Sequence, residues 1–239
     1  MTSPRKTTRA KILVIDIGGS HVKCLLSGEA TRRRFSSGPG LTPQQMVQGV
    51  LDLAADWHFD VISIGYPGVV RQGAPAREPR HLAPGWVGFD FEAAFGRPVR
   101  IVNDAAMQAL GGYRGGKMLF LGLGTGLGSA LIVDGHIVAM ELGHLRRSRR
   151  HDYEDLLGKR GCKRLGKRKW RRKVHAVVGG FSAALLPDEI VVGGGQADRL
   201  KELPPRTRRG SNADALLGGF RLWDESLPTP SANTYKDLT

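Results

Sequence analysis

The sequence has little cysteine, few aromatic residues and no long apolar run. Its two cysteines, Cys24 and Cys162, form no CxxC pair, which excludes a disulfide framework and indicates reduced intracellular thiols. No apolar stretch reaches the roughly 18 residues that would predict a spanning helix. The basic N-terminus lacks the apolar segment of a secretory signal. We therefore expect a cytoplasmic protein without membrane attachment.

Acidic residues are scarce relative to basic ones. The 239-residue chain has 36 Lys and Arg against 22 Asp and Glu, a formal net charge of +14. Most of this excess lies in residues 146–173, here called the basic block, where 14 Lys and Arg face three acidic residues. A basic block of this density favours a polyanionic partner. The alternative interpretation is a solvated helix face.

Apolar runs and helical periodicities follow the same order twice, which predicts two βββαβα-like halves, 11–102 and 117–195. Each half opens with a glycine-rich hairpin, and together they indicate an α/β protein with two lobes around a central cleft. The expected strands are 11–17, 21–26, 32–36, 60–65, 99–102, 117–123, 129–133 and 190–192, and the expected helices are 43–57, 105–112, 153–157, 165–178 and 212–223. The lobes are expected at 11–104 and 105–225, with disordered tails at 1–10 and 226–239 and a long loop at 71–85.

The first glycine-rich turn follows a strand that carries Asp16. Glycine turns let backbone N–H groups approach phosphate oxygens, and a carboxylate can hold a hydrated Mg²⁺. We expect Asp16 to bind Mg²⁺ through water and Lys23 to add a positive charge. The residues predicted to form this phosphate loop are Asp16, Gly18, Gly19, Ser20 and Lys23. The alternative is a plain hairpin turn.

A second glycine loop, residues 122–128, reads GLGTGLG. It is not GxxxxGK[ST], and its spacing departs from GxGxxG; a strand and not a helix is expected after it. What remains is a strand–loop–strand nest with one hydroxyl, suited to phosphate oxygens, or a glycine-rich hairpin with no ligand. Gly124, Thr125 and Gly126 are its candidate donor-binding residues. Gly194 and Gly195, after a later strand, could admit an adenine or a phosphate chain, or form a simple turn.

Asn103 and Asp104 end an expected strand. In phosphoryl transfer to an alcohol, one carboxylate can orient the hydroxyl and accept its proton, which makes Asp104 the candidate general base. The alternative is an N-cap for the helix that follows. Glu141 and His144 share a turn, and a carboxylate with an imidazole can grip adjacent sugar hydroxyls. A zinc site would need further ligands, for which Cys162 is the only thiol candidate.

These segments together resemble the ROK family of sugar kinases, in the actin-like ATPase superfamily, and within it the polyphosphate glucokinases. The resemblance rests on the order and spacing of six segments, which are VIDIGGSHVK (14–23), GYPGVV (65–70), VNDAAMQAL (102–110), LGLGTGLGSALIVDG (121–135), ELGH (141–144) and GGG (193–195). It implies two RNase H-like lobes hinged about a cleft. It also implies transfer of a phosphate to the 6-hydroxyl of glucose or a similar hexose, with Mg²⁺ and with Asp104 as proton acceptor.

The resemblance places Asn103, Glu141 and His144, with Gly68 of GYPGVV, at the sugar. It suggests a homodimer as well. Two departures stand out. The cysteine cluster that binds zinc in most ROK kinases is replaced here by the basic block, so no zinc is expected. His81 also stands where the resemblance leads us to expect an uncharged polar residue such as Asn, which leaves the sugar preference open.

The basic block can act as a docking track for inorganic polyphosphate, because a linear polyanion needs cations along its path. The residues assigned to this cationic track are Lys159, Arg160, Lys167, Arg168, Arg171 and Arg172. Trp170 among them could pack or stack. ATP is an alternative donor at the same cleft. Two rival functions stay open: an ATP-dependent ROK hexokinase of other sugar specificity, and a degenerate kinase fold that binds nucleic acid or another polyanion.

Overall fold

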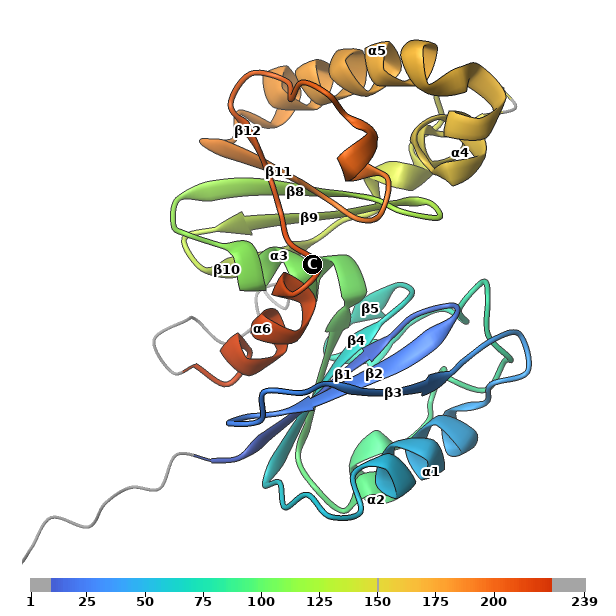
Figure 1. The fold of residues 1–239 in the computed structure, drawn as a ribbon, viewed down its shortest axis with the longest axis vertical. Coiled ribbons are helices and arrows are strands. Elements are labelled where there is room, and N and C mark those ends of the chain that lie inside the picture. Colours follow the sequence, from blue (N-terminus) through green and yellow to red (C-terminus); the bar gives the residue numbers. More distant parts are fainter. Residues whose placement is uncertain (1–9, 150, 225–239) are drawn as a thin grey trace, which may run out of the picture.

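The computed structural model describes residues 10–149 and 151–224 and contains two five-stranded sheets (Figure 1). One sheet is formed by residues before 104 and the other by residues after 116. Apart from residue 10, the tails predicted at 1–10 and 226–239 lie outside the described residues. The two-lobed α/β architecture expected from the sequence is confirmed.

The N-terminal sheet has the strand order β3-β2-β1-β4-β7. Its first three strands pair antiparallel, while β4 and β7 continue parallel to β1. The strands are β1 (Ile12–Ile17), β2 (His21–Leu26), β3 (Arg33–Ser36), β4 (Val61–Tyr66) and β7 (Val99–Asn103). Helices α1 (Pro43–Leu53) and α2 (Phe91–Phe95) cover its outer face, and β5 (Val70–Arg71) and β6 (Ala74–Pro75) form a small hairpin at one end.

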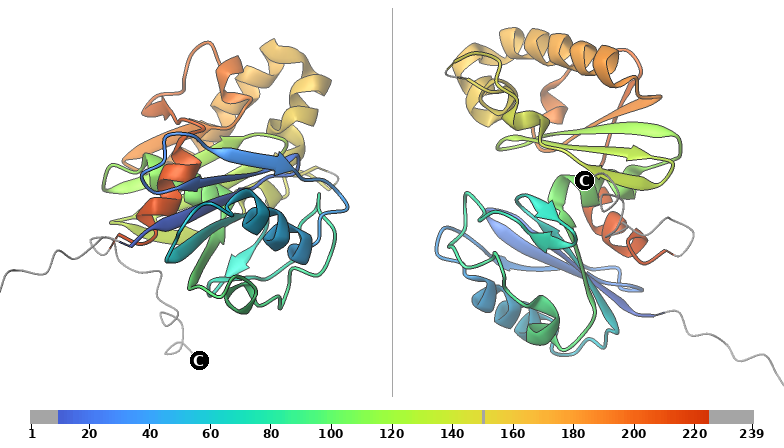
Figure 2. Two further views of the ribbon diagram at one scale, coloured as in Figure 1. Left: turned by 60° about the horizontal axis from the view of Figure 1, so that its bottom comes forward. Right: turned by 180° about the vertical axis from the view of Figure 1, so that it is seen from behind.

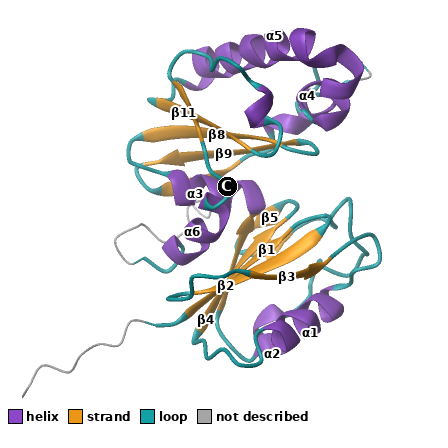
Figure 3. Cartoon of the chain, viewed as in Figure 1, coloured by secondary structure: helices purple, strands orange, loops and turns teal. Residues whose placement is uncertain are grey.

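The C-terminal sheet repeats this topology, with the order β10-β9-β8-β11-β12. Again three strands pair antiparallel and two more run parallel to the first. The strands are β8 (Lys117–Leu123), β9 (Leu127–Val133), β10 (His136–Ala139), β11 (Glu189–Gly193) and β12 (Thr207–Arg209). Helices α4 (Tyr153–Leu157) and α5 (Lys159–Leu185) lie over its outer face (Figure 3). Two short helices, η1 (Leu142–His144) and η2 (Ala197–Arg199), lie in its connections.

Helices α3 (Asp104–Gly112) and α6 (Asp214–Arg221) lie between the two sheets (Figure 2). They cross so closely that no side chain separates their backbones. A Cβ atom on Gly218 would lie 1.7 Å from the Met107 carbonyl oxygen, and one on Gly111 would lie 1.9 Å from the Asp214 carbonyl oxygen. Glycine is therefore required at this crossing, since any larger residue would push the helices apart.

Helix α6 is also attached to the N-terminal sheet. The Ser63 hydroxyl of β4 donates to the Gly219 carbonyl (2.6 Å) and accepts from the Trp223 indole N–H (2.9 Å). The Arg100 guanidinium of β7 lies 4.1 Å from the centre of the Trp223 ring. Residues 214–223 thus pack on the N-terminal sheet, although they follow every strand of the C-terminal sheet in sequence. The lobe limits of 11–104 and 105–225 stay a proposal, since α3 contacts both sheets and α6 contacts α3 and the N-terminal sheet.

Most predicted elements are present, with shifted ends. Thr42 caps α1 in a capping box with Gln45, as its position before Pro43 predicts. The helix expected over 165–178 is part of the longer α5, whose backbone is interrupted at Gly166 (φ 73°, ψ 152°). The prediction did not include α2, β12 or the β5–β6 hairpin, because each is short and weakly periodic.

Substituting Gly218 with Ala should destabilise the protein and lower its activity, since the new methyl group would overlap the α3 backbone. Overpacking of this kind costs about 1–3 kcal/mol. The measurement is the free energy of unfolding in urea.

The matched control is Gly180→Ala in α5, where a Cβ would meet nothing within 4 Å. This change should stabilise by up to about 1 kcal/mol, because Ala is the better helix former. Equal stabilities for the two variants would contradict the close crossing.

Candidate functional site

Asp16 is directed toward the junction of the lobes by the alternation of β1. Leu13, Ile15 and Ile17 pack into the core under α1, while Ile12 and Val14 face the opposite way, toward α6. Successive side chains of a strand point to opposite faces, so Asp16 shares the α6-facing side. Its cross-strand partner in β2 is Lys23, whose Nζ lies 2.8 Å from Asp16 Oδ2. The structure therefore brings these two members of the predicted phosphate loop together.

The first phosphate loop leaves only part of its backbone free. The Gly18 N–H donates to the His21 carbonyl (3.0 Å), and the Gly18 carbonyl accepts from the Ser37 hydroxyl (2.5 Å). These bonds fix the turn. Gly19 and Ser20, both exposed, are the members of the turn whose N–H groups remain for an anion.

The second glycine loop ends β8 and is fastened to the start of α5. The Gly124 N–H donates to the Gly126 carbonyl (3.1 Å), and the Lys159 N–H donates to the carbonyls of Gly124 and Thr125 (3.1 and 3.2 Å). Thr125 is exposed. The predicted loop is thus a formed turn with its hydroxyl outward, and the first residue of α5 lies directly against it.

Gly194 and Gly195 lie beside this loop. Gly194 has a left-handed backbone (φ +80°), and a Cβ there would lie 2.5 Å from the Leu123 carbonyl oxygen. The same carbonyl accepts from the Gln196 N–H (2.8 Å). The structure therefore brings the predicted 193–195 turn against the end of β8, from which the Gly124–Gly126 loop begins.

Asn103, and not Asp104, caps helix α3. The Asn103 side-chain oxygen accepts from the N–H groups of Ala105 and Ala106 (2.9 and 3.3 Å), and its amide nitrogen donates to the Gly68 carbonyl (3.0 Å). Asn103 and Gly68 are thus joined, as their shared assignment to the sugar suggests, although both use these groups to hold the fold. The side chain of Asp104, the next residue, is therefore not needed as the helix cap.

Asp104 lies in a strongly perturbing environment. Its side chain is half-buried at the first turn of α3, and its Oδ1 accepts from the Ala105 N–H (2.8 Å). Burial raises the pKa of Asp104 to about 7, and the charges of Asp16 and Glu141 add to the rise. A carboxyl group that titrates near neutrality suits a general base at that pH.

Glu141 and His144 are linked to two residues that the sequence did not single out. His144 Nδ1 lies 3.7 Å from Glu141 Oε2, and His144 Nε2 lies 3.8 Å from Glu154 Oε2. The other Glu154 oxygen accepts from Arg80 (3.0 Å). Burial raises the pKa of Glu141, and the charge of His144 opposes this rise. In the sequence, Glu154 is one of three acidic residues in the basic block, and no motif or periodicity distinguishes it or Arg80.

The segment predicted as a long loop is held in place by two residues. The Glu78 carboxylate accepts from the N–H groups of residues 85, 86 and 87 (3.0–3.2 Å). Trp86 is fully buried and donates its indole N–H to the Ala83 carbonyl (2.7 Å). His81 lies against the first phosphate loop, since a Cβ on Gly19 would be 3.4 Å from the His81 Cβ.

The basic block runs through α4 and along α5. Five of the six residues of the cationic track are exposed; Arg171 is partly buried and donates to the Arg199 carbonyl. Trp170 is fully buried, with its indole N–H donated to the Leu157 carbonyl (3.0 Å), so it packs in the core and cannot stack on a ligand. Arg150 of the block lies outside the described residues.

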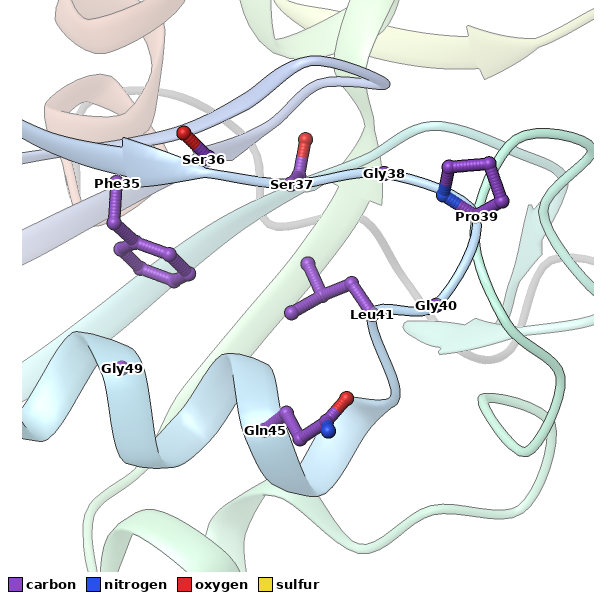
Figure 4. A pocket seen from close by; sticks show the side chains of 9 residues that line it. All are labelled: Phe35, Ser36, Ser37, Gly38, Pro39, Gly40, Leu41, Gln45 and Gly49. Carbon is purple, nitrogen blue, oxygen red and sulfur yellow. The ribbon is translucent and has the colours of Figure 1, made fainter.

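A separate hollow of about 470 Å³ lies between β3 and α1 (Figure 4). Its floor is apolar, formed by Phe35 and Leu41, and its rim is the 36–40 loop. It contains none of the predicted site residues. The Ser37 N–H, on its rim, donates to the Ser20 carbonyl (3.0 Å) and connects this loop to the first phosphate turn.

The donor set at Asp16 fits Mg²⁺ but not a structural transition metal. Mg²⁺ is commonly held by one or two carboxylates, water and substrate phosphates, and Asp16 has one oxygen that does not bond Lys23. Within residues 10–149 and 151–224 no group of three His, Cys, Asp or Glu side chains is arranged to hold an ion.

Over the same ranges, no helix has the length and apolarity to cross a membrane.

Comparison with curated proteins finds polyphosphate glucokinases at low identity. The protein of Mycobacterium leprae is 28% identical over 217 residues, covering 81% of this chain and 67% of the relative. That of Mycobacterium tuberculosis H37Rv is 26% identical over 219 residues, covering 81% and 80%. A bifunctional enzyme NanE/NanK of Brucella melitensis matches over a shorter region, with 30% identity across 53% of this chain and 27% of the relative.

Solved structures of the same architecture include an inorganic polyphosphate/ATP-glucomannokinase from Arthrobacter sp. strain KM. It superposes with a TM-score of 0.75 at 25% identity, covering 88% of this chain and 97% of that one. A ROK family glucokinase from Streptomyces griseus, in complex with glucose and AMPPNP, has a TM-score of 0.71 at 17% identity, covering 87% and 97%. A ROK family model matches residues 12–163, and the chain therefore belongs to the ROK family, whose relatives found here are mainly sugar kinases.

Proposed function

We propose that the protein is a glucokinase that transfers a phosphoryl group from inorganic polyphosphate, with ATP as a second donor, to the 6-hydroxyl of glucose. The observation that carries the proposal is Asp104. Its carboxyl group has a pKa of about 7 and is not the helix cap. The charges of Asp16 and Glu141 both act on it, and we assign Asp16 to the first phosphate loop and Glu141 to the candidate sugar site.

The proposed reaction is an in-line displacement. The acceptor oxygen bonds to the terminal phosphorus while the bond from that phosphorus to its bridging oxygen breaks, and the hydroxyl proton passes to Asp104. Little covalent work falls to the protein, so positioning and charge stabilisation carry the catalysis. The free N–H groups of the two glycine turns are suited to phosphate oxygens. Mg²⁺, when held at Asp16, supplies positive charge to the phosphates.

Polyphosphate as donor is supported by where the cationic track begins. Its first residue, Lys159, bonds through its backbone to the Gly124–Gly126 loop, and exposed cations continue along α5. A chain whose terminal phosphate reaches the loop could continue over Arg160 toward Arg168 and Arg172. The Mycobacterium and Arthrobacter relatives are polyphosphate enzymes by name, which agrees with this interpretation.

Two other functions are tested by the same experiment. An ATP-dependent kinase for another sugar is favoured by His81, which replaces the expected amide, and by the partial match to NanE/NanK. A polyanion-binding protein is favoured by the basic block alone. The test measures sugar phosphate formation with glucose, mannose and N-acetylated hexoses, each with polyphosphate and with ATP. Tight RNA binding without any sugar phosphate would overturn the proposal.

The value of kcat/KM should fall about tenfold per pH unit below about pH 7, because the proton acceptor must be ionised and the pKa of Asp104 in the ligand-free protein is about 7. Asp104→Asn should lower turnover by about 10²- to 10⁴-fold and remove this pH dependence. Steady-state kinetics from pH 5.5 to 9 provide the measurement. Asp52→Asn, at an exposed position of α1, is the control and should keep the wild-type pH profile. An unchanged pH profile in Asp104→Asn would contradict the role of Asp104 as proton acceptor.

Asp104→Asn should also stabilise the ligand-free protein, and more so as the pH rises. The folded state keeps a proton up to about pH 7, whereas the unfolded chain loses it near 3.8. The folded state therefore binds more protons between these values, and the wild-type free energy of unfolding declines as pH rises through that window. The Asn variant avoids this loss, of a few kcal/mol at most. Urea unfolding at pH 5 and pH 8 should show the larger gain at pH 8; a larger gain at pH 5 would contradict the raised pKa.

Neutralising Arg168 and Arg172, which lie four residues apart on α5, should raise the KM for long polyphosphate several-fold and leave the KM for ATP within about twofold. Each lost phosphate contact also lowers the salt dependence of polyphosphate binding by about one unit of log–log slope. The matched control removes the exposed Arg71 and Arg114, so that the net charge is equal. If both double variants change polyphosphate binding equally, the effect comes from overall charge, and the assignment of polyphosphate docking to the cationic track is wrong.

A further inference from the structure

Arg80 is presented by a loop of the N-terminal lobe that has little freedom to move. The Glu78 carboxylate, two residues earlier, accepts three backbone N–H groups from residues 85–87. The Arg77 carbonyl accepts from the Tyr66 hydroxyl (2.8 Å), and the buried ring of Tyr66 lies 5.7 Å from that of Trp86. Both ends of the segment around Arg80 are thus tied to the core beside β4, and its guanidinium has a defined direction.

That direction is across the junction between the lobes. Arg80 Nη1 bonds to Glu154 Oε1 at 3.0 Å, and Glu154 belongs to α4 of the C-terminal lobe. The other Glu154 oxygen faces His144, which in turn faces Glu141. A series of polar contacts therefore runs from the N-terminal loop into the candidate sugar site, in the order Arg80, Glu154, His144 and Glu141. Opening the lobes would break this series at the Arg80–Glu154 bond.

Glu154 also borders the second glycine loop. A Cβ placed on Gly126 would lie 2.7 Å from the Glu154 carboxyl carbon. The carboxylate is therefore packed against the turn that we assign to the donor, and an unneutralised negative charge there would oppose an incoming polyanion. Arg80 supplies the nearest countercharge from the other lobe.

We propose that Arg80 is a positioning residue whose ion pair with Glu154 favours the closed arrangement of the two lobes and holds Glu154 beside His144; this inference rests on the proposed sugar kinase function. The Arg80 side chain is 58% exposed and that of Glu154 is 19% exposed. Exposed ion pairs are weak, so the pair biases closure by about two- to fivefold and does not lock it. A site that must admit sugar and release its phosphate requires such a reversible contact.

The first test measures lobe closure without any substrate. Gln44→Cys in α1 and Ala183→Cys in α5, both exposed, take spin labels on opposite lobes, while the native Cys24 and Cys162 are buried. Electron–electron double resonance should show a larger share of long distances after Arg80→Ala and an intermediate share after Arg80→Lys. Arg71→Ala, an exposed arginine of the neighbouring hairpin, is the matched control and should leave the distances unchanged.

Exchanging the partners, Arg80→Glu with Glu154→Arg, should return the distances toward those of the wild type, because the cross-lobe pair is restored with reversed signs. Distances in Arg80→Ala equal to those of the wild type, or equal changes in Arg71→Ala, would overturn the proposal. Since no substrate is present, this result is obtained whether or not the chain phosphorylates a sugar, and it separates failure of this inference from failure of the proposed function.

The second test uses the sugar kinase assay. Arg80→Ala should raise the KM for the acceptor about two- to fivefold with less than a twofold change in turnover, because closure and acceptor binding are linked. Arg80→Lys should recover part of the loss, while Arg71→Ala should match the wild type. A loss of turnover at unchanged acceptor KM would indicate a role in the chemical step and overturn the assignment as a positioning residue.

Discussion

The backbone contact between α3 and α6 is the constraint on which the rest of the structure depends. Gly111 and Gly218 allow the two helices to meet without intervening side chains, and the Arg221 side chain of α6 donates to the Leu110 and Tyr113 carbonyls at the end of α3. Because α3 begins with Asp104, its attachment to α6 determines where that carboxylate lies relative to both sheets. Loosening of the crossing would displace Asp104 and would also open the buried cluster that Met107 and Leu216 form with Ile12 and Val14.

Negative charge is concentrated around this point, in a protein whose overall charge is strongly positive. Asp16, Asp104 and Glu154 are carboxylates from three different elements, Glu141 precedes η1, and each has a positive or titratable partner except Asp104. Burial, together with the charges of Asp16 and Glu141, raises the pKa of Asp104 to about 7. The same arrangement is costly for folding, and such strain is common where reactivity is needed. The basic residues outside the site, along α5, do not relieve it because they face solvent.

The sequence was sufficient for the local elements and for the contacts that strand register imposes. Alternation in β1 predicts the direction of Asp16, and its pairing with Lys23 follows from the short turn between β1 and β2. It did not reveal that Asn103 would cap α3, because Asn and Asp are equally good caps and stand side by side. Nor did it reveal Arg80 and Glu154, which lie 74 residues apart and meet only because the lobes face one another. The role of Trp170 was ambiguous in the sequence because its neighbours are cationic, and the structure shows that it is buried in the core against which α5 packs.

The attachment of residues 214–223 to the N-terminal sheet has a consequence for synthesis. Asp104 and the whole first sheet leave the ribosome long before α6 does, yet Ser63, Val14 and Met107 remain without their glycine-lined partner until then. Contacts between such distant segments form late. The nascent chain can thus assemble each sheet in turn but cannot orient Asp104 until more than a hundred further residues have emerged, so the junction of the two lobes is completed only near the end of translation.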